Sequence, residues 1–527
     1  TGSIHRMSRR LLKNTAIVGG MTLVSRVLGL ARDIVLARFG ATAGMDAFFV
    51  AFKIPNFLRR LFAEGAFAQA FVPVLAEYKE QRSPEAVQAL ISRVAGTLLG
   101  ILSLVAVVGV LASPVLITVF APGFLYRDAA QFELAAGMLR LTFPYILFVS
   151  LVAFAAGVLN TFGRFAAASF TPVWLNIVLI SAALLVAPEL EQGEMALAGA
   201  VFIAGVVQLL FLLPSLRRIH CLPRPRWGIR DSGVRRIMKL MIPGIIGSSA
   251  AQINLLVDTM LASFLVTGSV TWLFYSDRLM EFPLGVFAIA LSTVILPSLS
   301  RSHANGADAE FSATLDWGLR GVMLIGIPSA AGLILLARPI LATLFQHGDF
   351  TAADVNMAGL SLTAYAVGLP GFMLIKVLAP AFYSRKDPRT PVRIAIIALA
   401  VTLVLNLSFV FGMLQLGIPG AHAGLALATS LGAWVNAGLL FRNLHRERIY
   451  RPLPGWGRYA GQVMFAVVVL SAILYAGVPA IDAWLARDAL GRILWLLLWV
   501  AAGIAVYFLV LRLSGVRFTA VWRKRPE

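Results

Sequence analysis

The stretch FKIPNFLRRLFAEG, residues 52–65, lies inside a long apolar run, yet it carries Lys53, Arg59, Arg60 and Glu64. Each arginine at the centre of a membrane helix costs about 2.5–3.5 kcal/mol on insertion scales. Charges at such depths are expected where they line water, pair with one another or bind a ligand. The stretch therefore predicts a membrane helix with a functional polar face.

The rest of the chain is typical of a membrane protein. Of the 527 residues, 59% are hydrophobic and 13% are charged, whereas soluble domains carry about 25% charged residues. Apolar runs of roughly 20 residues or more predict about fourteen helical spans. They lie near 15–39, 46–78, 88–120, 132–160, 168–188, 195–216, 236–266, 269–300, 312–337, 354–384, 391–415, 420–442, 456–478 and 489–513. The predicted fold class is an all-α polytopic membrane protein.

The distribution of charge predicts the orientation in the membrane. The formal net charge is +20, but most of the excess lies in short connections between spans, which argues against nucleic acid as a partner. The connections 217–239, 384–393 and 442–458 hold eight, four and five Lys or Arg, whereas 39–45 and 265–270 hold none. The positive-inside rule then places both termini in the cytoplasm.

The two halves of the chain resemble each other. Pro73 falls opposite Pro297, and Gly44 falls opposite Gly268, when the second half is aligned with the first. An even number of spans separates the copies, so they share one orientation and form a parallel repeat of two six-helix lobes around a substrate site. A final pair of helices lies outside this repeat.

The predicted parts of the chain follow from these boundaries. They are a cytoplasmic N-terminus at 1–14, a first lobe at 15–216, a basic cytoplasmic loop at 217–235, a second lobe at 236–442, a cytoplasmic loop at 443–455, a helix pair at 456–513 and a basic cytoplasmic tail at 514–527. Residues 1–6 resemble a cloning remnant before Met7, and no cleavable signal peptide is visible. The single cysteine, Cys221, excludes an intrachain disulfide framework.

Ionisable residues inside spans concentrate in the first, second and eighth. The basic ones are Arg26, Arg32, Lys53, Arg59, Arg60 and Arg278, and the acidic ones are Asp33, Glu64, Asp277 and Glu281. Spacing favours Arg26 and Asp33 on one helix face, and an ion pair between Arg60 and Glu64. The cations outnumber the acids, and the arginine fork suits phosphate. We therefore expect a hydrated cavity between the lobes for an anionic, phosphorylated substrate.

Other polar residues in the spans have more ordinary explanations. Arg38, Arg93, Arg140 and Arg320 lie towards span ends, where arginines snorkel or form structural ion pairs. Pro55 should kink the second span, with Asn56 placed to satisfy the backbone that the proline frees. The last two spans either pack against lipid or form a groove for a long lipid tail. Motifs of metalloproteases, serine hydrolases and P-loops are absent, which weakens an enzyme reading.

Four segments carry a resemblance to a known family. They are SRVLGLARD (25–33), DAFFVAFKIPNFLRRLFAEGAFAQAFVPVLAEY (46–78), YSDRLMEFPLGV (275–286) and VLAPAFYSRKDPRTPV (377–392). The chain resembles the MviN/MurJ family of bacterial lipid II flippases, within the multidrug/oligosaccharidyl-lipid/polysaccharide exporter superfamily. The resemblance implies fourteen helices and a C-terminal helix pair that holds the undecaprenyl tail. It also implies transport of lipid II across the cytoplasmic membrane by alternating access, without an enzymatic cofactor.

The resemblance also implies functional positions. The essential cavity arginines correspond to Arg26, Arg32, Arg59 and Arg278, with Arg60 adjacent, and the functional acidic residues correspond to Asp33, Asp46 and Glu64. Lys53, Asp277 and Glu281 are secondary candidates. A sodium site of some members corresponds to Asp258, Asn406 and Thr429, but its second acidic ligand is replaced here by Val410.

Several alternatives remain open at this point. A flippase for another undecaprenyl-diphosphate saccharide fits the same cationic cavity, whereas a cation or drug antiporter would need an acidic one. A lipid-modifying membrane enzyme and a non-transporting scaffold for the cell-wall synthesis machinery belong to other classes. The expected partners are lipid II, the surrounding membrane lipids and that machinery.

Overall fold

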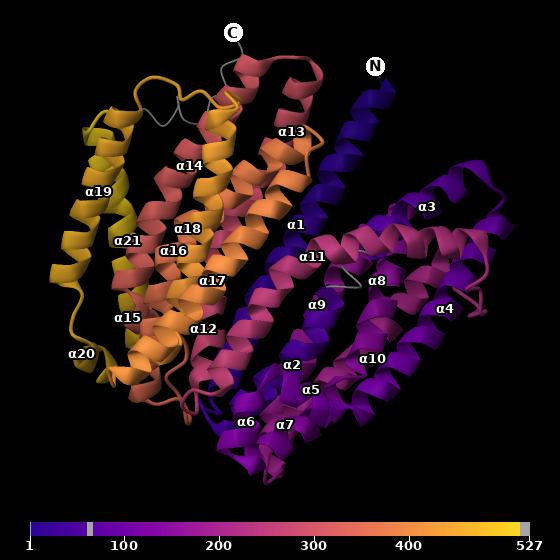
Figure 1. The fold of residues 1–527 in the computed structure, drawn as a ribbon, viewed down its shortest axis with the longest axis horizontal. Helices are drawn as coiled ribbons and strands as arrows, with labels where there is room; N and C mark the ends of the chain where they lie inside the picture. Colours follow the sequence, from indigo (N-terminus) through magenta and orange to yellow (C-terminus); the bar gives the residue numbers. More distant parts are fainter. Residues whose placement is uncertain (1, 61–66, 517–527) are drawn as a thin grey trace. The chain divides into compact units, whose positions relative to one another are not determined.

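The computed structural model describes residues 2–60 and 67–516, with side chains described outside 2–18, 243–251 and 287–293 (Figure 1). The described residues form helices and turns, and none of them forms a strand. The chain divides into two compact units, Thr1–Gly268 (unit 1) and Ser269–Glu527 (unit 2). The predicted all-α class is thereby confirmed.

Unit 1 is built from long helices and short helical segments. They are α1 (Gly2–Ala37), α2 (Ala43–Arg59), α3 (Ala68–Gln81), α4 (Pro84–Leu111), α5 (Ser113–Phe120), α6 (Pro122–Arg127), α7 (Ala129–Thr142), α8 (Tyr145–Thr161), α9 (Phe165–Ser181), the π-helical η2 (Ala182–Val186), the 3₁₀ turn η3 (Ala187–Glu189), α10 (Gly193–Arg218) and α11 (Ser232–Ser263). Helix α1 packs on α9, α2 on α7, and α10 on both α8 and α9.

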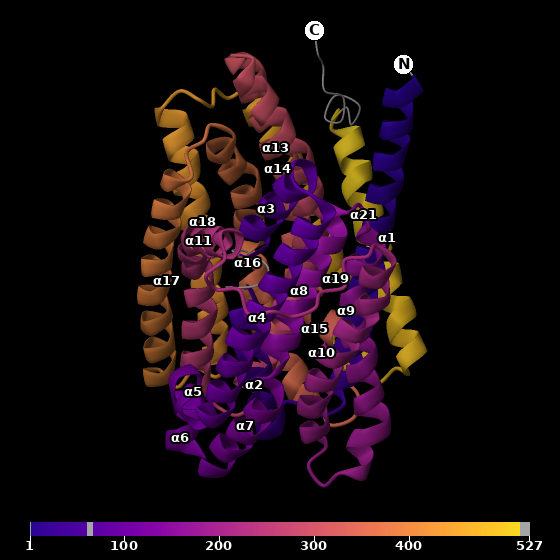
Figure 2. The ribbon, with the colours of Figure 1, turned by 90° about the vertical axis from the view of Figure 1, so that its right-hand side faces the viewer.

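Unit 2 contains the remaining helices. They are α12 (Ser269–Pro283), the π-helical η4 (Leu284–Ala288), α13 (Ile289–Ala304), α14 (Asp308–Leu335), α15 (Ala337–Leu344), α16 (Ala352–Ser384), α17 (Arg389–Gln415), α18 (Ala421–Arg446), α19 (Trp456–Gly477), α20 (Ile481–Leu485) and α21 (Ala489–Leu513). Helix α16 is central to the unit, because α12, α13, α14, α15 and α18 all pack on it. Helices α16, α17 and α18 stand close together in both views (Figure 2).

The division between the units differs from the predicted boundary of the lobes. The sequence predicts a second lobe that begins at residue 236, whereas unit 1 continues to Gly268. The reason is that α11 packs along α3, α4, α5 and α6. Two ion pairs fasten its first turns there, from Arg236 to Glu77 on α3 and from Arg93 on α4 to Asp231.

Ten of the described helical segments are long and apolar enough to cross a membrane. The other predicted spans correspond to α1, to α2 with α3, to α11, and to α12 with α13. Helices α2, α3, α12 and α13 have 17, 14, 15 and 16 residues. The π-helical η4 separates α12 from α13, and residues 61–66 between α2 and α3 lie outside the described part of the chain. The count of fourteen spans stays a prediction.

Local sequence signals explain where the helices begin and how closely they pack. Thr351 and Asp354 form a capping box at the start of α16, and Ser83 caps α4. Within unit 2, α16 and α18 approach so closely that a Cβ at Gly368 would overlap Ser430. Small residues commonly permit such contacts between membrane helices.

Two turns at corresponding positions of the predicted repeat have the same backbone geometry. Gly163 after α8 and Lys386 after α16 both have left-handed backbones, with φ of 72° and 61°. The next residues, Arg164 and Asp387, donate equivalent backbone hydrogen bonds to Leu159 and Phe382 at 2.8 and 3.0 Å. These turns match the resemblance between segments 160–172 and 381–391 in the sequence.

Candidate functional site

A buried ion pair occupies the first predicted span. Arg32 and Asp33 on α1 are 5% and 3% exposed. The Nε and Nη2 atoms of Arg32 donate to Oδ1 of Asp33 at 2.9 and 2.6 Å. Spacing favours a shared face for Asp33 and Arg26, but the structure pairs Asp33 with the adjacent Arg32. Arg26 is half-buried and has no charged partner among the described residues.

A third residue completes this pair from another helix. Nη1 of Arg32 donates to Oδ1 of Asn176 on α9 at 3.1 Å, and Nδ2 of Asn176 donates to the carbonyl of Ser25 at 3.2 Å. Asn176 is 4% exposed and stands alone within the apolar segment of α9. We call Arg32, Asp33 and Asn176 the Arg32 cluster. Sequence analysis missed Asn176, although a lone amide in an apolar span is itself a signal of a buried polar contact.

A second buried polar contact lies near this cluster. The hydroxyl of Tyr145 on α8 donates to Gln208 on α10 at 3.3 Å, and Gln208 donates to the carbonyl of Thr171 at 2.9 Å. Tyr145 lies within electrostatic range of both Arg59 and Arg32. The packing of α1, α2, α8, α9 and α10 therefore gathers polar groups that are far apart in the sequence.

In α2, the backbone carbonyl that Pro55 leaves without a donor is satisfied by another residue than the expected Asn56. Pro55 cannot donate to the carbonyl of Ala51, and that oxygen instead accepts from Thr142 on α7 at 2.8 Å. Asn56 donates to the carbonyl of Phe52 at 2.8 Å and accepts from Nε of Arg59 at 3.2 Å. Asn56 thus orients the arginine, while α7 compensates for the proline.

The other candidates on α2 have different surroundings. Asp46 is 2% exposed, and its Oδ2 accepts from the backbone amide of Gly268 at 2.7 Å. Gly268 has a φ of 95°, and a residue with a side chain would be strained in this backbone conformation. Asp46 therefore holds the turn at the end of unit 1. Lys53 is half-buried and Arg60 is exposed, and Glu64 lies outside the described residues.

In unit 2, the candidate residues lie on α12. Nη1 of Arg278 donates to Oε2 of Glu281 at 3.3 Å, with side chains 35% and 44% exposed. The guanidinium also lies 5.3 Å from the ring centre of Phe274. Asp277 is half-buried on the same helix. Because the ion pair is long and half-exposed, it contributes about 0–1 kcal/mol and can be exchanged for another anion.

The residues of the predicted sodium site lie in both units. Asp258 is on α11 in unit 1, where its Oδ2 accepts from Asn254 at 3.1 Å. Asn406 on α17 and Thr429 on α18 belong to unit 2, and Val410 is buried one helical turn after Asn406. Among the described residues, no group of three or more His, Cys, Asp or Glu is arranged to hold a metal. The sodium site stays a prediction.

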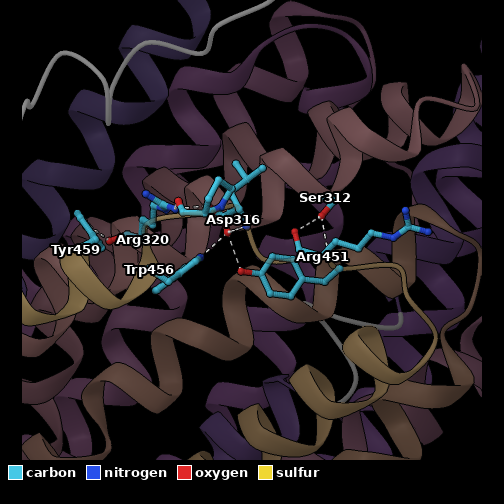
Figure 3. A network of polar contacts seen from close by, with 9 residues as sticks. Ser312, Asp316, Arg320, Arg451, Trp456 and Tyr459 are labelled. Carbon is cyan, nitrogen blue, oxygen red and sulfur yellow. Dashed lines mark hydrogen bonds and ion pairs between the residues drawn. The ribbon is translucent and has the colours of Figure 1, made fainter.

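A fully satisfied carboxylate lies on α14 in unit 2 (Figure 3). Asp316 accepts from Tyr450, Trp456 and the amide of Leu453 through Oδ1 at 2.8, 2.6 and 3.1 Å. Its Oδ2 accepts from Nε of Arg320 at 2.7 Å. Burial and the bond to Asp316 raise the pKa of Tyr450, so the phenol remains a donor at neutral pH. Asp316 thereby joins α14 to the loop that leads into α19.

Arginines near span ends serve such structural contacts. Arg320 also donates to the carbonyl of Pro454 at 3.1 Å and lies over the rings of Trp456 and Tyr459 at 5.2 and 5.4 Å. Arg93 pairs with Asp231. For these two arginines, the expected structural ion pairs are confirmed.

The geometry permits anion binding more readily than covalent chemistry. Each of the three side-chain nitrogens of Arg32 donates one hydrogen bond, to Asp33 or to Asn176. A guanidinium has five N–H donors, so these three bonds do not use all of them. Arg59 and Arg278 are half-buried. These guanidinium groups can donate hydrogen bonds to phosphate oxygens while Arg32 stays paired with Asp33.

Comparison with known proteins identifies relatives along nearly the whole chain. The family model described as lipid II flippase MurJ matches residues 35–494. A probable lipid II flippase MurJ of Vibrio cholerae is 47% identical over 519 residues, covering 97% of each chain. The lipid II flippase MurJ of Burkholderia cenocepacia is 43% identical over 524 residues, and the match covers 98% of this chain and 100% of the relative.

Solved structures agree with these relatives. A lipid II flippase MurJ in an inward closed conformation has a TM-score of 0.78 and 26% identity, covering 94% of this chain and 98% of that one. An inward-facing multidrug resistance MATE family transporter of the MOP superfamily has a TM-score of 0.65 at 17% identity, covering 82% and 98%, which shows a shared fold alone. By its sequence over almost its full length, the chain belongs to the lipid II flippase MurJ family.

Proposed function

We propose that this chain carries lipid II from the cytoplasmic to the periplasmic leaflet of the bacterial cytoplasmic membrane by alternating access. The match to a probable lipid II flippase MurJ over 97% of the chain is the observation that carries the proposal. Both termini would lie in the cytoplasm, as the distribution of Lys and Arg predicts. Transport needs no chemical change in the lipid, so we propose no enzymatic activity and no catalytic cofactor.

The arginines suit the diphosphate of such a lipid. An arginine fork binds phosphate oxygens through two parallel, charge-assisted hydrogen bonds. Arg32 is held in place by Asp33 and Asn176, so its orientation is set before a ligand arrives. Arg59 and Arg278 are the more adaptable members, because their side chains are half-buried. Arg26, Arg60 and Lys53 add positive charge to the same spans.

Two further elements complete the proposal. The exposed apolar face of α21, which includes Leu494, Leu498 and Phe508, supports a seat for the undecaprenyl tail beside α19. Asp258, Asn406 and Thr429 would hold a coupling sodium ion. Since Val410 supplies no oxygen ligand, we expect weaker sodium binding than in a site with a second carboxylate.

A translocation assay with purified protein in liposomes tests the proposal. Arg278→Ala should lower lipid II flipping about a hundredfold, which corresponds to about 2.7 kcal/mol of lost binding, and Arg278→Lys should restore part of it. The matched control is Arg301→Ala at the exposed end of α13 in the same unit. It should flip normally.

The same assay separates the alternatives. A flippase for another saccharide would leave lipid II in place but move its own undecaprenyl-diphosphate substrate. An enzyme would return a chemically altered lipid, and a scaffold would move neither lipid. Normal flipping by Arg278→Ala at normal abundance would contradict a role for this arginine in binding the diphosphate.

A further inference from the structure

Unit 1 contains an apolar groove that the proposed transport does not use. It has a volume of about 730 Å³ and lies between α4, α8 and the first turns of α11. Its walls include Leu98, Ile101 and Leu102 on α4, together with Val234 and Met238 on α11. Such walls suit hydrocarbon chains.

Three cations line the same groove. Arg230 precedes α11, and Arg235 and Lys239 lie on its first turns, and all three are exposed. Nearby carboxylates are already engaged. Asp231 pairs with Arg93, while Glu77 accepts two hydrogen bonds from Arg236 at 2.9 and 2.8 Å.

The three groove cations therefore retain their charge for a ligand. Among the described residues, no carboxylate forms an ion pair with any of them. Cationic groups beside an apolar groove complement a molecule with a phosphate at one end and a long apolar chain at the other.

A buried hydroxyl also faces this groove without a partner. Ser150 on α8 lines the groove and is 6% exposed, yet its Oγ has no hydrogen-bond partner. Thr97, on the opposite wall, is satisfied because its Oγ1 accepts from the amide of Gly228 at 3.2 Å. A buried hydroxyl without a partner is destabilising unless a ligand or water satisfies it. Ser150 thus offers a donor for an oxygen of a bound molecule.

The loop before α11 fixes the cations at the edge of the groove. The amides of Arg224 and Arg226 donate to Ser92 on α4 at 3.2 and 3.0 Å, and Gly228 is bound to Thr97. A side chain at Gly96 would collide with the backbone of Arg226, so the loop lies directly on α4. Trp227 beside it is 62% exposed, as expected for a residue at a membrane interface.

We propose that this groove binds one anionic phospholipid of the cytoplasmic leaflet. The acyl chains lie along α4, α8 and α11, the phosphate faces Arg230, Arg235 and Lys239, and the Ser150 hydroxyl donates to a lipid oxygen. Basic pockets between membrane helices on the cytoplasmic side recognise anionic headgroups in this way. The inference rests on the proposed orientation of the chain and is independent of lipid II transport.

Native mass spectrometry of the purified full-length protein tests the site. Phosphatidylglycerol is titrated into the delipidated protein and compared with phosphatidylcholine of the same acyl chains. The test variant combines Arg230→Gln, Arg235→Gln and Lys239→Gln. Its matched control combines Arg217→Gln, Arg224→Gln and Arg226→Gln, which removes equal charge from the same connection outside the groove.

We expect the Kd for phosphatidylglycerol to rise at least about tenfold in the test variant and to change less than about twofold in the control. Ile101→Trp should also weaken binding, because the indole fills the apolar part of the groove while the cations remain. Wild-type protein should bind phosphatidylcholine more weakly than phosphatidylglycerol.

Three results would overturn the inference. Equal loss in the test and control triples would show non-specific attraction, and equal affinity for the two phospholipids would exclude anion recognition. Displacement of phosphatidylglycerol by an equal or lower concentration of undecaprenyl phosphate would assign the groove to a polyprenyl chain. Because Ile101→Trp and the lipid comparison keep all three cations, they decide the question even if the triple variant does not fold.

Discussion

Arg32 and Asp33 form an ion pair within α1 that a residue of α9 completes, whereas Asp316 and Arg320 form an ion pair within α14 that the loop before α19 completes. Both carboxylates are buried, because Asp33 is 3% exposed and Asp316 is 1% exposed. Asp316 receives four donors, three of them from the segment 450–456. Arg32, by contrast, is held by its immediate neighbour and by one amide from α9.

The difference lies in what each pair leaves available. Asp316 and Arg320 are bound to aromatic side chains and loop carbonyls, so their arrangement resembles a permanent clamp. The guanidinium of Arg32 keeps donor capacity beyond its three hydrogen bonds to Asp33 and Asn176. We infer that a buried ion pair indicates a binding function when an arginine remains incompletely used, and a structural function when its carboxylate is saturated.

The largest effect is expected at the clamp on α14. Asp316→Ala removes the acceptor of four donors and leaves Arg320 without its carboxylate, so the free energy of unfolding should fall by about 3–5 kcal/mol. Unfolding by denaturant in detergent measures this loss. Asp308→Ala, at the exposed first turn of the same helix, is the control and should change stability by a few tenths of that amount. Equal stability of the two variants would contradict a clamp.

The Arg32 cluster should separate stability from transport. Arg32→Gln alone removes the cation that pairs with the buried Asp33, so both abundance and flipping should fall. The double variant Arg32→Gln with Asp33→Asn removes both charges, and should recover abundance while flipping stays about a hundredfold low, or about 2.7 kcal/mol. Abundance by immunoblot and flipping in liposomes provide the two measurements. Normal flipping by the double variant would show that this pair is structural, like the one on α14.

A smaller effect is expected at the amide that orients Arg32. Asn176→Leu leaves Nη1 of Arg32 without its acceptor and should cost about 1–3 kcal/mol, with flipping reduced about tenfold. Ile177→Leu, the adjacent lipid-exposed position, serves as the control. If Asn176→Leu flips at the normal rate, Arg32 keeps its orientation through Asp33 alone.

The smallest effect concerns a cap outside the membrane. Asp387 accepts from the hydroxyl of Thr390 at 2.6 Å and from the amides of Arg389 and Thr390 at 3.2 Å. The hydroxyl of Thr390, followed by these amides, lowers the pKa of Asp387 even though partial burial opposes it. Its charged form therefore stabilises the start of α17 at pH values above the usual Asp pKa.

This contribution has a defined pH dependence. It should be about 0.5–1 kcal/mol at neutral pH and should disappear as the pH falls through the lowered pKa of the folded state. Denaturant unfolding of wild type and Asp387→Asn across acidic pH measures it, because the asparagine cannot ionise. A difference that grows as the pH falls would have the wrong sign for this cap.

The contrast between the two pairs also shows how far sequence reasoning reaches. The excess of arginine in the first, second and eighth spans was visible directly, because insertion of a charge into lipid has a large and local cost. Asn56, Pro55 and Asp46 were also visible as unusual residues within apolar segments. The residues that bind this part of α2 were not visible. Thr142 lies 91 residues after Ala51, and Gly268 lies 222 residues after Asp46.

By itself, the sequence determined the helical membrane class, the polar spans and the division of charge between connections, because hydrophobic length and charge act locally along the chain. Only the tertiary structure decided that Arg32 binds Asn176, and that Asp316 holds the loop before α19. A hydrogen bond requires its donor and acceptor to approach within about 3 Å. That approach depends on how helices distant in sequence pack against each other, so spacing along one helix could not reveal it.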